Sequence, residues 1–184
     1  MFCRSIRTLG MDAEAAMYRA TGGVNTHKGL IFSLGLLAAA AGQWYARHLE
    51  ASETCLTAEA LCEQEAVLAR EFLPGLGRTA GTHGQEVCQK YQAEGIRKEA
   101  LSGFRSVLRA AMPHLRSSAG SLEQRGMRAL VELMASVEDT NVLYRGGPSA
   151  LQELARRAVG IAAACPENLE SILAEWNQDL CRKR

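Results

Sequence analysis

The chain has 184 residues, of which 47% are hydrophobic, enough apolar sequence for one domain with a substantial core. Its 21 basic and 20 acidic residues give a formal net charge of +1, and only 5% of its residues are aromatic. A chain with neither a strong positive charge nor many stacking side chains does not match proteins that bind nucleic acid, so we exclude that class.

Hydrophobic residues recur mostly at helical spacing, so the sequence predicts an all-α fold: a helical bundle forming a single domain over residues 1–184. The predicted helices, in chain order, cover residues 11–20, 27–49, 57–72, 84–93, 96–117, 121–137, 148–164 and 167–181. We expect Thr57 to cap the third helix, and Pro74 and Gly75 to end it. The fifth helix is expected to break at Gly103 or Pro113.

Residues 29–46 form an uncharged run that is short for a membrane span and rich in alanine and glycine. We interpret this run as the middle of the helix 27–49, buried at the centre of the bundle. Its small side chains would let neighbouring helices approach closely. No membrane association is predicted.

The six cysteines include no CxxC pair and no close spacing to a histidine, so a zinc site is not predicted. No secretory signal sequence is recognisable before the first predicted helix. We therefore expect reduced thiols and a cytoplasmic location.

The stretch ATGGVNTHKGLIF, residues 20–32, begins a helix in an unusual way. Asn25 or Thr26 is the predicted N-cap, and His27 and Lys28 follow where the helix dipole favours anions. A bound phosphate would explain the two basic residues, because free backbone amides and a lysine together form an anion site. The alternative is a lysine that extends into solvent and a histidine that caps the helix.

The stretch EGIRKEALSGF, residues 94–104, also places cations near a predicted helix start. Arg97 and Lys98, with Glu99 beside them, occupy the first turns of the helix. An ordinary charged surface turn is the alternative interpretation.

The stretch EDTNVLYRGGP, residues 138–148, follows a mostly apolar helix. Pro148 suits the first position of the next helix, so Gly146 and Gly147 would bring backbone amides to that helix start, with Arg145 nearby. These features predict a second anion site.

Two oxygen-bearing side chains precede this site. Asp139 and Asn141 are hard oxygen ligands of the kind that Mg²⁺ uses together with phosphates. The alternative for Asp139 is an Asx-type turn. Taken together, the three stretches indicate a polyphosphate site on a helical scaffold.

The segments RATGGVNTHKGLIFSLGLL, GIRKEA with GF two residues later, and DTNVLYRGG, in this order and spacing, resemble the triphosphoribosyl-dephospho-CoA synthase family. The resemblance covers nearly the whole chain. It implies a transferase that moves the 5-triphosphoribosyl group of ATP to the 2′-hydroxyl of 3′-dephospho-CoA and releases adenine. The product is the precursor of the prosthetic group on the acyl carrier subunit of citrate lyase or malonate decarboxylase.

The resemblance also implies roles for individual residues. Binding of ATP is implied for Asn25, Thr26, His27, Lys28, Arg97, Asn141, Arg145, Gly146 and Gly147. Catalytic roles are implied for Glu99 and Asp139. Asp139 and Asn141 would hold Mg²⁺, whereas Glu99 would be either a second metal ligand or the base that accepts the hydroxyl proton. Lys28, Arg97 and Arg145 would contact the phosphates.

The chain departs from the family pattern at Lys98, where glycine is usual, and at Arg105, where proline is usual. The family also has a PKPGLVD-like motif upstream and an SPGGSAD-like motif downstream. We expect both to lie outside this chain, which would then be truncated at both ends and correspond to the central and C-terminal part of the synthase domain.

This expected truncation leaves two alternatives to an active enzyme. One is a non-catalytic helical module that binds MgATP, and the other is a fragment that needs a partner chain. Apolar surface left uncovered on helix 27–49 would also favour a homodimer.

Overall fold

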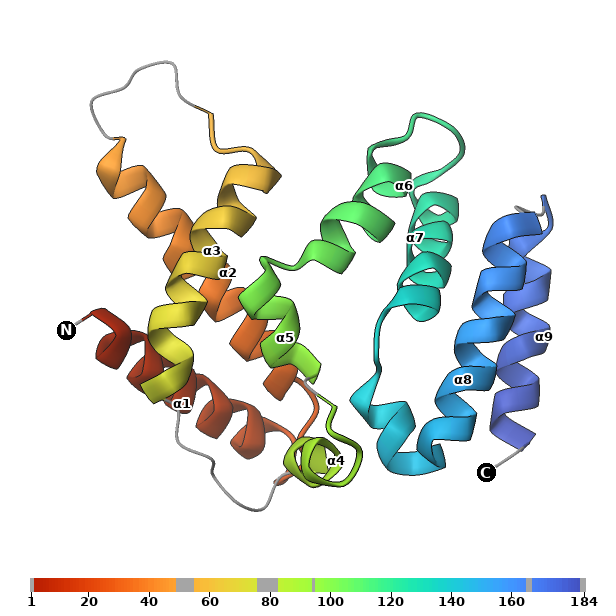
Figure 1. Cartoon of the computed structure of the whole chain (residues 1–184), viewed down its shortest axis with the longest axis horizontal. Helices are drawn as coiled ribbons and strands as arrows, with labels where there is room; N and C mark the ends of the chain where they lie inside the picture. Colours follow the sequence, from red (N-terminus) through yellow and green to blue (C-terminus); the bar gives the residue numbers. More distant parts are fainter. Residues whose placement is uncertain (1, 49–54, 76–82, 94, 165–166, 183–184) are drawn as a thin grey trace. The chain divides into compact units, whose positions relative to one another are not determined.

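The structure is a computed structural model, and it describes residues 2–48, 55–75, 83–93, 95–164 and 167–182. These residues form α-helices, one 3₁₀ turn and one π-helical turn, with no strand among them, which confirms the all-α prediction. The chain divides into two compact units, whose helices are labelled in Figure 1. Unit 1 comprises residues 1–80 and 96–105, and unit 2 comprises residues 81–95 and 106–184. A single domain that includes both units stays a prediction.

Unit 1 is built on the long helix α2 (Lys28–Arg47). Helices α1 (Phe2–Ala20) and α3 (Ala58–Phe72) pack against it, and a 3₁₀ turn (Leu73–Gly75) follows α3. The predicted cap of α3 is confirmed, because Thr57 Oγ1 accepts a hydrogen bond from the backbone N–H of Ala60 at 3.1 Å. Helix α1 begins nine residues before the predicted helix 11–20.

Helix α2 matches the predicted helix 27–49 to within two residues, but the prediction that it is buried is wrong. Its buried residues are Leu36, Ala40 and Trp44, which form a single stripe at four-residue spacing. Leu30 and Leu34 are 51% and 55% exposed. The physical reason is that α1 and α3 cover only part of the helix circumference.

The apolar character of α2 also bears on membrane association. By length and composition it is the one helix in the described part of the chain that could cross a membrane. A single such helix near the N-terminus is weak evidence, because core helices and signal sequences share these properties.

Helix α5 (Gly95–Ser102) ends at a turn that approaches α3 closely. Gly103 has a φ of +72°, and a Cβ atom there would lie 2.6 Å from the backbone oxygen of Cys62 in α3. Only glycine fits both the left-handed backbone and this distance. The next residue, Phe104, is buried. The predicted break at Gly103 is therefore confirmed.

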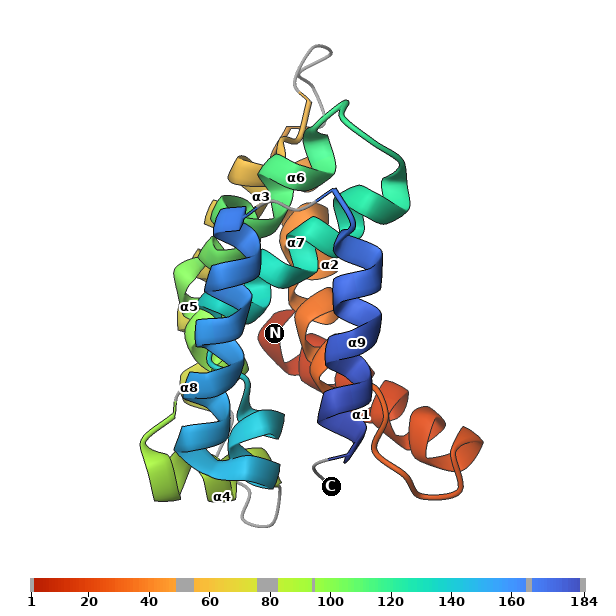
Figure 2. The same ribbon diagram turned by 90° about the vertical axis from the view of Figure 1, so that its right-hand side faces the viewer.

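Unit 2 contains the remaining helices. They are α4 (His83–Tyr91), a π-helical turn (Val107–Ala111), α6 (Met112–Arg116), α7 (Leu122–Ser136), α8 (Thr140–Ala164) and α9 (Leu169–Arg182). Helix α7 packs against both α8 and α9 (Figures 1 and 2). Their core consists of Val131, Ala158, Leu169 and Trp176. Pro113 lies in the first turn of α6 rather than at a break.

Helix α8 is longer than the predicted helix 148–164, which forms its second part. It begins at Thr140 and kinks at Gly147, directly before Pro148. A small cluster of Val87, Ala93 and Leu143 packs α4 against the first part of α8.

Candidate functional site

The candidate residues fall into two groups, one in each unit. Unit 1 holds residues 25–28, 97 and 99, whereas unit 2 holds residues 139, 141 and 145–147. The structure describes the geometry of each group within its own unit.

The loop before α2 does not form the predicted N-cap. Helix α2 begins at Lys28 with His27 in the N-cap position, so the prediction of Asn25 or Thr26 at that position is wrong. The His27 side chain makes no capping bond, and its Nδ1 lies 2.8 Å from Thr26 Oγ1. Asn25 still satisfies one free amide, because its Oδ1 accepts from the backbone N–H of Lys28 at 3.2 Å. Asn25 thus bonds to the first turn of α2 from a position two residues before the N-cap. Residue type alone therefore placed the N-cap too early in the chain.

Helix α1 supplies the negative charge that the start of α2 lacks. Lys28 Nζ lies 2.9 Å from Oε2 of Glu14, and the two side chains are 37% and 29% exposed. One turn further along α1, the sulfur of Met17 accepts a hydrogen bond from the backbone N–H of His27 at 3.1 Å. Two side chains of α1 therefore hold the junction between the loop and α2.

The second stretch lies in α5, as predicted. Arg97 and Glu99 are both half-buried within its first two turns. The backbone oxygen of Glu99 accepts hydrogen bonds from the N–H of Phe104 and from Ser102 Oγ, each at 2.8 Å. These two bonds close the turn that contains Gly103. Gly103 and Phe104, the last two residues of the motif, therefore serve the packing of α5.

Asp139 caps the start of α8. Its Oδ1 accepts from the backbone N–H groups of Asn141 and Val142, at 2.7 and 3.2 Å. This arrangement is the Asx-type turn that the sequence offered as the alternative to metal binding. Both Asp139 and Asn141 are exposed. Within the described ranges, no group of three His, Cys, Asp or Glu side chains could hold a metal ion.

The glycine pair forms the kink of α8. Gly147 has φ +72° and ψ −173°, and the straight second part of α8 starts at Pro148, as expected for a proline at a helix start. Arg145 and Gly146 are exposed beside it. A Cβ atom on Gly147 would lie 3.7 Å from the hydroxyl of Tyr91 in α4. The hydroxyl of Tyr91 therefore lies next to the candidate anion site, a neighbour that sequence spacing does not indicate.

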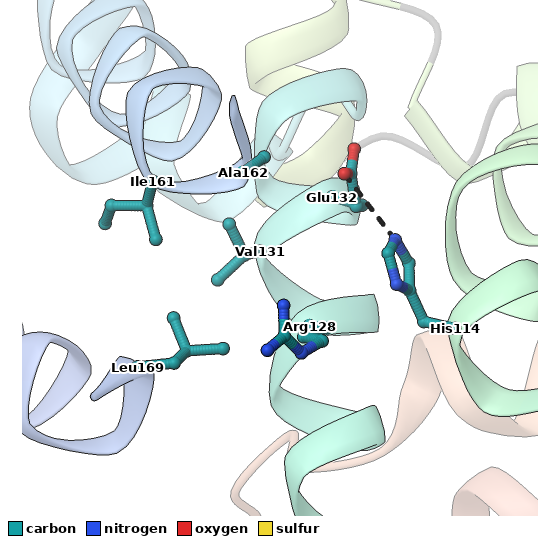
Figure 3. A pocket seen from close by; sticks show the side chains of 7 residues that line it. All are labelled: His114, Arg128, Val131, Glu132, Ile161, Ala162 and Leu169. Atoms are coloured by element: carbon teal, nitrogen blue, oxygen red, sulfur yellow. Dashed lines mark ion pairs between the residues drawn. The ribbon is translucent and has the colours of Figure 1, made fainter. Parts of the chain in front are cut away.

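Figure 3 shows a small pocket of unit 2. It is lined by His114, Arg128, Val131, Glu132, Ile161, Ala162 and Leu169. The histidine Nε2 lies 3.5 Å from Oε1 of Glu132, and most of the remaining wall is apolar. No candidate residue from the sequence lines this pocket.

Glu65 is a titratable residue that sequence reasoning missed. It is fully buried in α3, and neither carboxyl oxygen has a hydrogen-bond partner among the described residues. Burial raises the pKa of this carboxyl to about 7. The signal lay in the helical spacing, because Cys62, Ala66, Ala69 and Glu65 share one stripe and only the last is charged.

A family model described as CitG, ATP:dephospho-CoA triphosphoribosyl transferase, matches residues 1–184. The chain belongs to this family. This match confirms the resemblance inferred from the three sequence segments, and it includes both units.

Three relatives illustrate how the chain relates to other CitG-family proteins. Each is described as a probable 2-(5″-triphosphoribosyl)-3′-dephosphocoenzyme-A synthase. The relative from Acinetobacter calcoaceticus is 33% identical over 184 residues, which cover 97% of this chain and 59% of the relative. The relative from Stutzerimonas stutzeri is 39% identical over 162 residues, or 85% of this chain and 53% of the relative. The relative from Albidiferax ferrireducens is 38% identical over 189 residues, covering 99% and 62%.

The chain thus spans between about half and two thirds of the length of these CitG-family relatives. No solved structure matches the chain significantly.

Proposed function

We propose that the chain carries out, or contributes to, the reaction named by its family. The reaction transfers the 5-triphosphoribosyl group of ATP to the 2′-hydroxyl of 3′-dephospho-CoA and releases adenine. The observation that carries the proposal is the match of the family model to residues 1–184. The exposed, polar helix starts of α2 and of the second part of α8 support it.

The chemistry sets the demands on the protein. The bond broken is the N-glycosidic bond of ATP, so the triphosphate must be held without being hydrolysed. Positive charge develops on the ribose as adenine departs, as in glycoside hydrolysis. The protein must position the acceptor hydroxyl at the anomeric carbon and provide a group that accepts its proton.

The phosphate contacts are assigned to three cations. Lys28 lies at the start of α2 and Arg145 beside the start of the second part of α8, where the helix dipole favours anions. Arg97, half-buried in α5, is the third. ATP contacts are also proposed for three residues of unit 1, Asn25, Thr26 and His27, and for three residues of unit 2, Asn141, Gly146 and Gly147.

Glu99 and Asp139 are the proposed catalytic carboxylates. Glu99 is assigned as the base or as a second metal ligand. A carboxylate has about four lone-pair sites on its two oxygens, so capping of α8 through Oδ1 of Asp139 is compatible with a metal at Oδ2.

The side-chain oxygens of Asp139 and Asn141 fit Mg²⁺ only as an ion that binds together with ATP. The described residues offer no cluster of three ligands, and Mg²⁺ commonly binds through one or two carboxylates plus substrate phosphates and water. Asp139 and Asn141 would hold the ion, which would neutralise part of the triphosphate charge.

The alternatives to an active transferase are a helical module that binds MgATP without transferring the ribosyl group, and a fragment that needs a partner chain. We also assign the chain to the cytoplasm, where five cysteines in the described part of the chain, all free thiols, would stay reduced. Its product would serve the acyl carrier subunit of citrate lyase or malonate decarboxylase.

Mass spectrometry of a reaction with the purified chain, MgATP and 3′-dephospho-CoA tests the proposal. Free adenine together with the triphosphoribosyl adduct, both lost in Asp139→Ala and Lys28→Ala, supports the transferase. MgATP binding without adenine release supports the binding module instead. If the folded chain alone neither binds MgATP nor releases adenine, the transferase and the binding module are both refuted, and activity restored by a second chain would support the fragment that needs a partner.

A further inference from the structure

The ion pair between Glu14 and Lys28 has a consequence for ATP binding, and this inference rests on the proposed function. Lys28 is proposed to contact the triphosphate, yet its ammonium already lies 2.9 Å from a carboxylate oxygen of Glu14. An ammonium group beside a carboxylate cannot move to a phosphate without weakening that contact. Binding of the triphosphate must therefore compete with Glu14.

We infer that Glu14 is a positioning residue that holds Lys28 at the start of α2 until a triphosphate displaces it. In the free chain the carboxylate pairs with the lysine ammonium. In the bound state the ammonium pairs with a phosphate oxygen, and Glu14 turns toward solvent.

Three features of the junction support an exchange. The two side chains are about one-third exposed, so both can reach water when the pair opens. The loop does not depend on the pair for its shape, because Met17 and Asn25 bond to the backbone N–H groups of His27 and Lys28. In addition, a carboxylate left beside a triphosphate would repel it, so displacement of Glu14 lowers the energy of the bound state.

The inference predicts the direction in which affinity changes. Glu14→Gln removes the competing charge and keeps the size of the side chain, so the chain should bind triphosphate more tightly. An ion pair with about one-third of each side chain exposed contributes about 0.2–1 kcal/mol, which corresponds to an affinity gain of up to about fivefold. A carboxylate that only maintained the shape of the junction would have the opposite effect, because its loss would weaken binding.

Titration calorimetry with inorganic triphosphate, with and without Mg²⁺, tests this prediction in four variants of the full chain. They are Glu14→Gln, Lys28→Met, the double variant, and Asp12→Asn as a matched control that removes one exposed carboxylate from the same helix. We expect tighter binding in Glu14→Gln, weaker binding in Lys28→Met, and no gain from Glu14→Gln once Lys28 is absent. Asp12→Asn should change the affinity by less than Glu14→Gln.

Several results would overturn the inference. One is a Glu14→Gln affinity equal to or weaker than that of the unaltered chain, and another is a gain that persists in the double variant or equals that of Asp12→Asn. If Glu14→Gln weakened binding only of the complex of Mg²⁺ with triphosphate, Glu14 would be a metal ligand instead. Absence of triphosphate binding in the unaltered chain would also refute it.

Adenine release measured on the same preparations keeps this inference separate from the proposed function. Release without a Glu14→Gln gain refutes only the exchange at Lys28. A gain without release in the presence of 3′-dephospho-CoA refutes only the transferase.

Discussion

Replacing Glu65 with methionine should stabilise unit 1 at neutral and alkaline pH. Methionine has a similar length and no charge, so it removes a buried carboxyl group with no hydrogen-bond partner among the described residues. The pKa of the carboxyl rises from 4.5 to about 7 because the group is buried. Each tenfold change in proton affinity corresponds to about 1.4 kcal/mol, so the ionised carboxylate costs about 3 kcal/mol at pH 8.

The sign of the pH dependence follows from the direction of the shift. Because the folded-state pKa lies above the unfolded-state value, folding favours the protonated carboxyl. This contribution to the free energy of unfolding is largest below about pH 4.5, falls as the pH rises toward about 7, and is constant above that. The difference in stability between Glu65→Met and the unaltered chain should therefore grow by about 3 kcal/mol between pH 4.5 and pH 8.

Urea unfolding followed by tryptophan fluorescence measures this difference. The chain has two tryptophans, Trp44 in unit 1 and Trp176 in unit 2, so a Trp176→Phe background reports on unit 1 alone. Comparing both chains at the same pH cancels the titration of other groups. Glu63→Met, at an exposed position on the same helix, is the matched control and should change stability by less than about 0.5 kcal/mol. If Glu65→Met has the same effect at both pH values, the inference of a raised pKa is refuted.

Three further substitutions test other features. Gly103→Ala should lower the free energy of unfolding of unit 1 by about 2 kcal/mol or more, because the backbone there is left-handed and the added Cβ would meet the backbone oxygen of Cys62. Gly126→Ala, in the open middle of α7, should be neutral or stabilising, and equal effects of the two variants in urea unfolding would contradict this reasoning. Asp139→Ala should lower the free energy of unfolding by about 1 kcal/mol, because the helix cap is lost. Asp139→Ser should keep most of the cap and still lose adenine release if the carboxylate binds the metal, so full activity in the serine variant would exclude that role. Leu34→Glu, on the exposed side of α2, should lower self-association in sedimentation experiments without lowering stability if the chain forms a homodimer; unchanged association would argue against an interface there.

Local signals in the sequence predicted where most of the helices lie, although not all of their ends. Thr57 was recognised as a cap because its side chain can satisfy a free amide three residues later, and this interaction depends on nothing distant in the chain. The break at Gly103 and the helix start at Pro148 also follow from local backbone chemistry. By contrast, the burial of α2 depends on how many helices surround it, and its own hydropathy does not contain that information.

The site was harder to predict because its contacts link distant parts of the chain. The residue pattern identified the cation of Lys28 but not its partner, which lies on α1. Tyr91 approaches Gly147 from α4 in the same way. For Asp139 the contacts are local instead. Its Oδ1, which the sequence pattern had suggested as a metal ligand, accepts hydrogen bonds from the backbone two and three residues later. The family resemblance came from the residue types, whereas the structure supplied the neighbours that suggest what those residues do.

The path of the chain between its two units limits how the molecule can be divided. The chain crosses from one unit to the other after residues 80, 95 and 105, so neither unit is a continuous segment. A single cut by a protease cannot release either unit whole, and a fragment ending before α5 lacks part of unit 1. During synthesis on the ribosome, unit 1 can be completed only after residues 81–95 of unit 2 have already emerged. The two units therefore cannot be made one after the other, and isolating either one would require circular permutation or a designed linker.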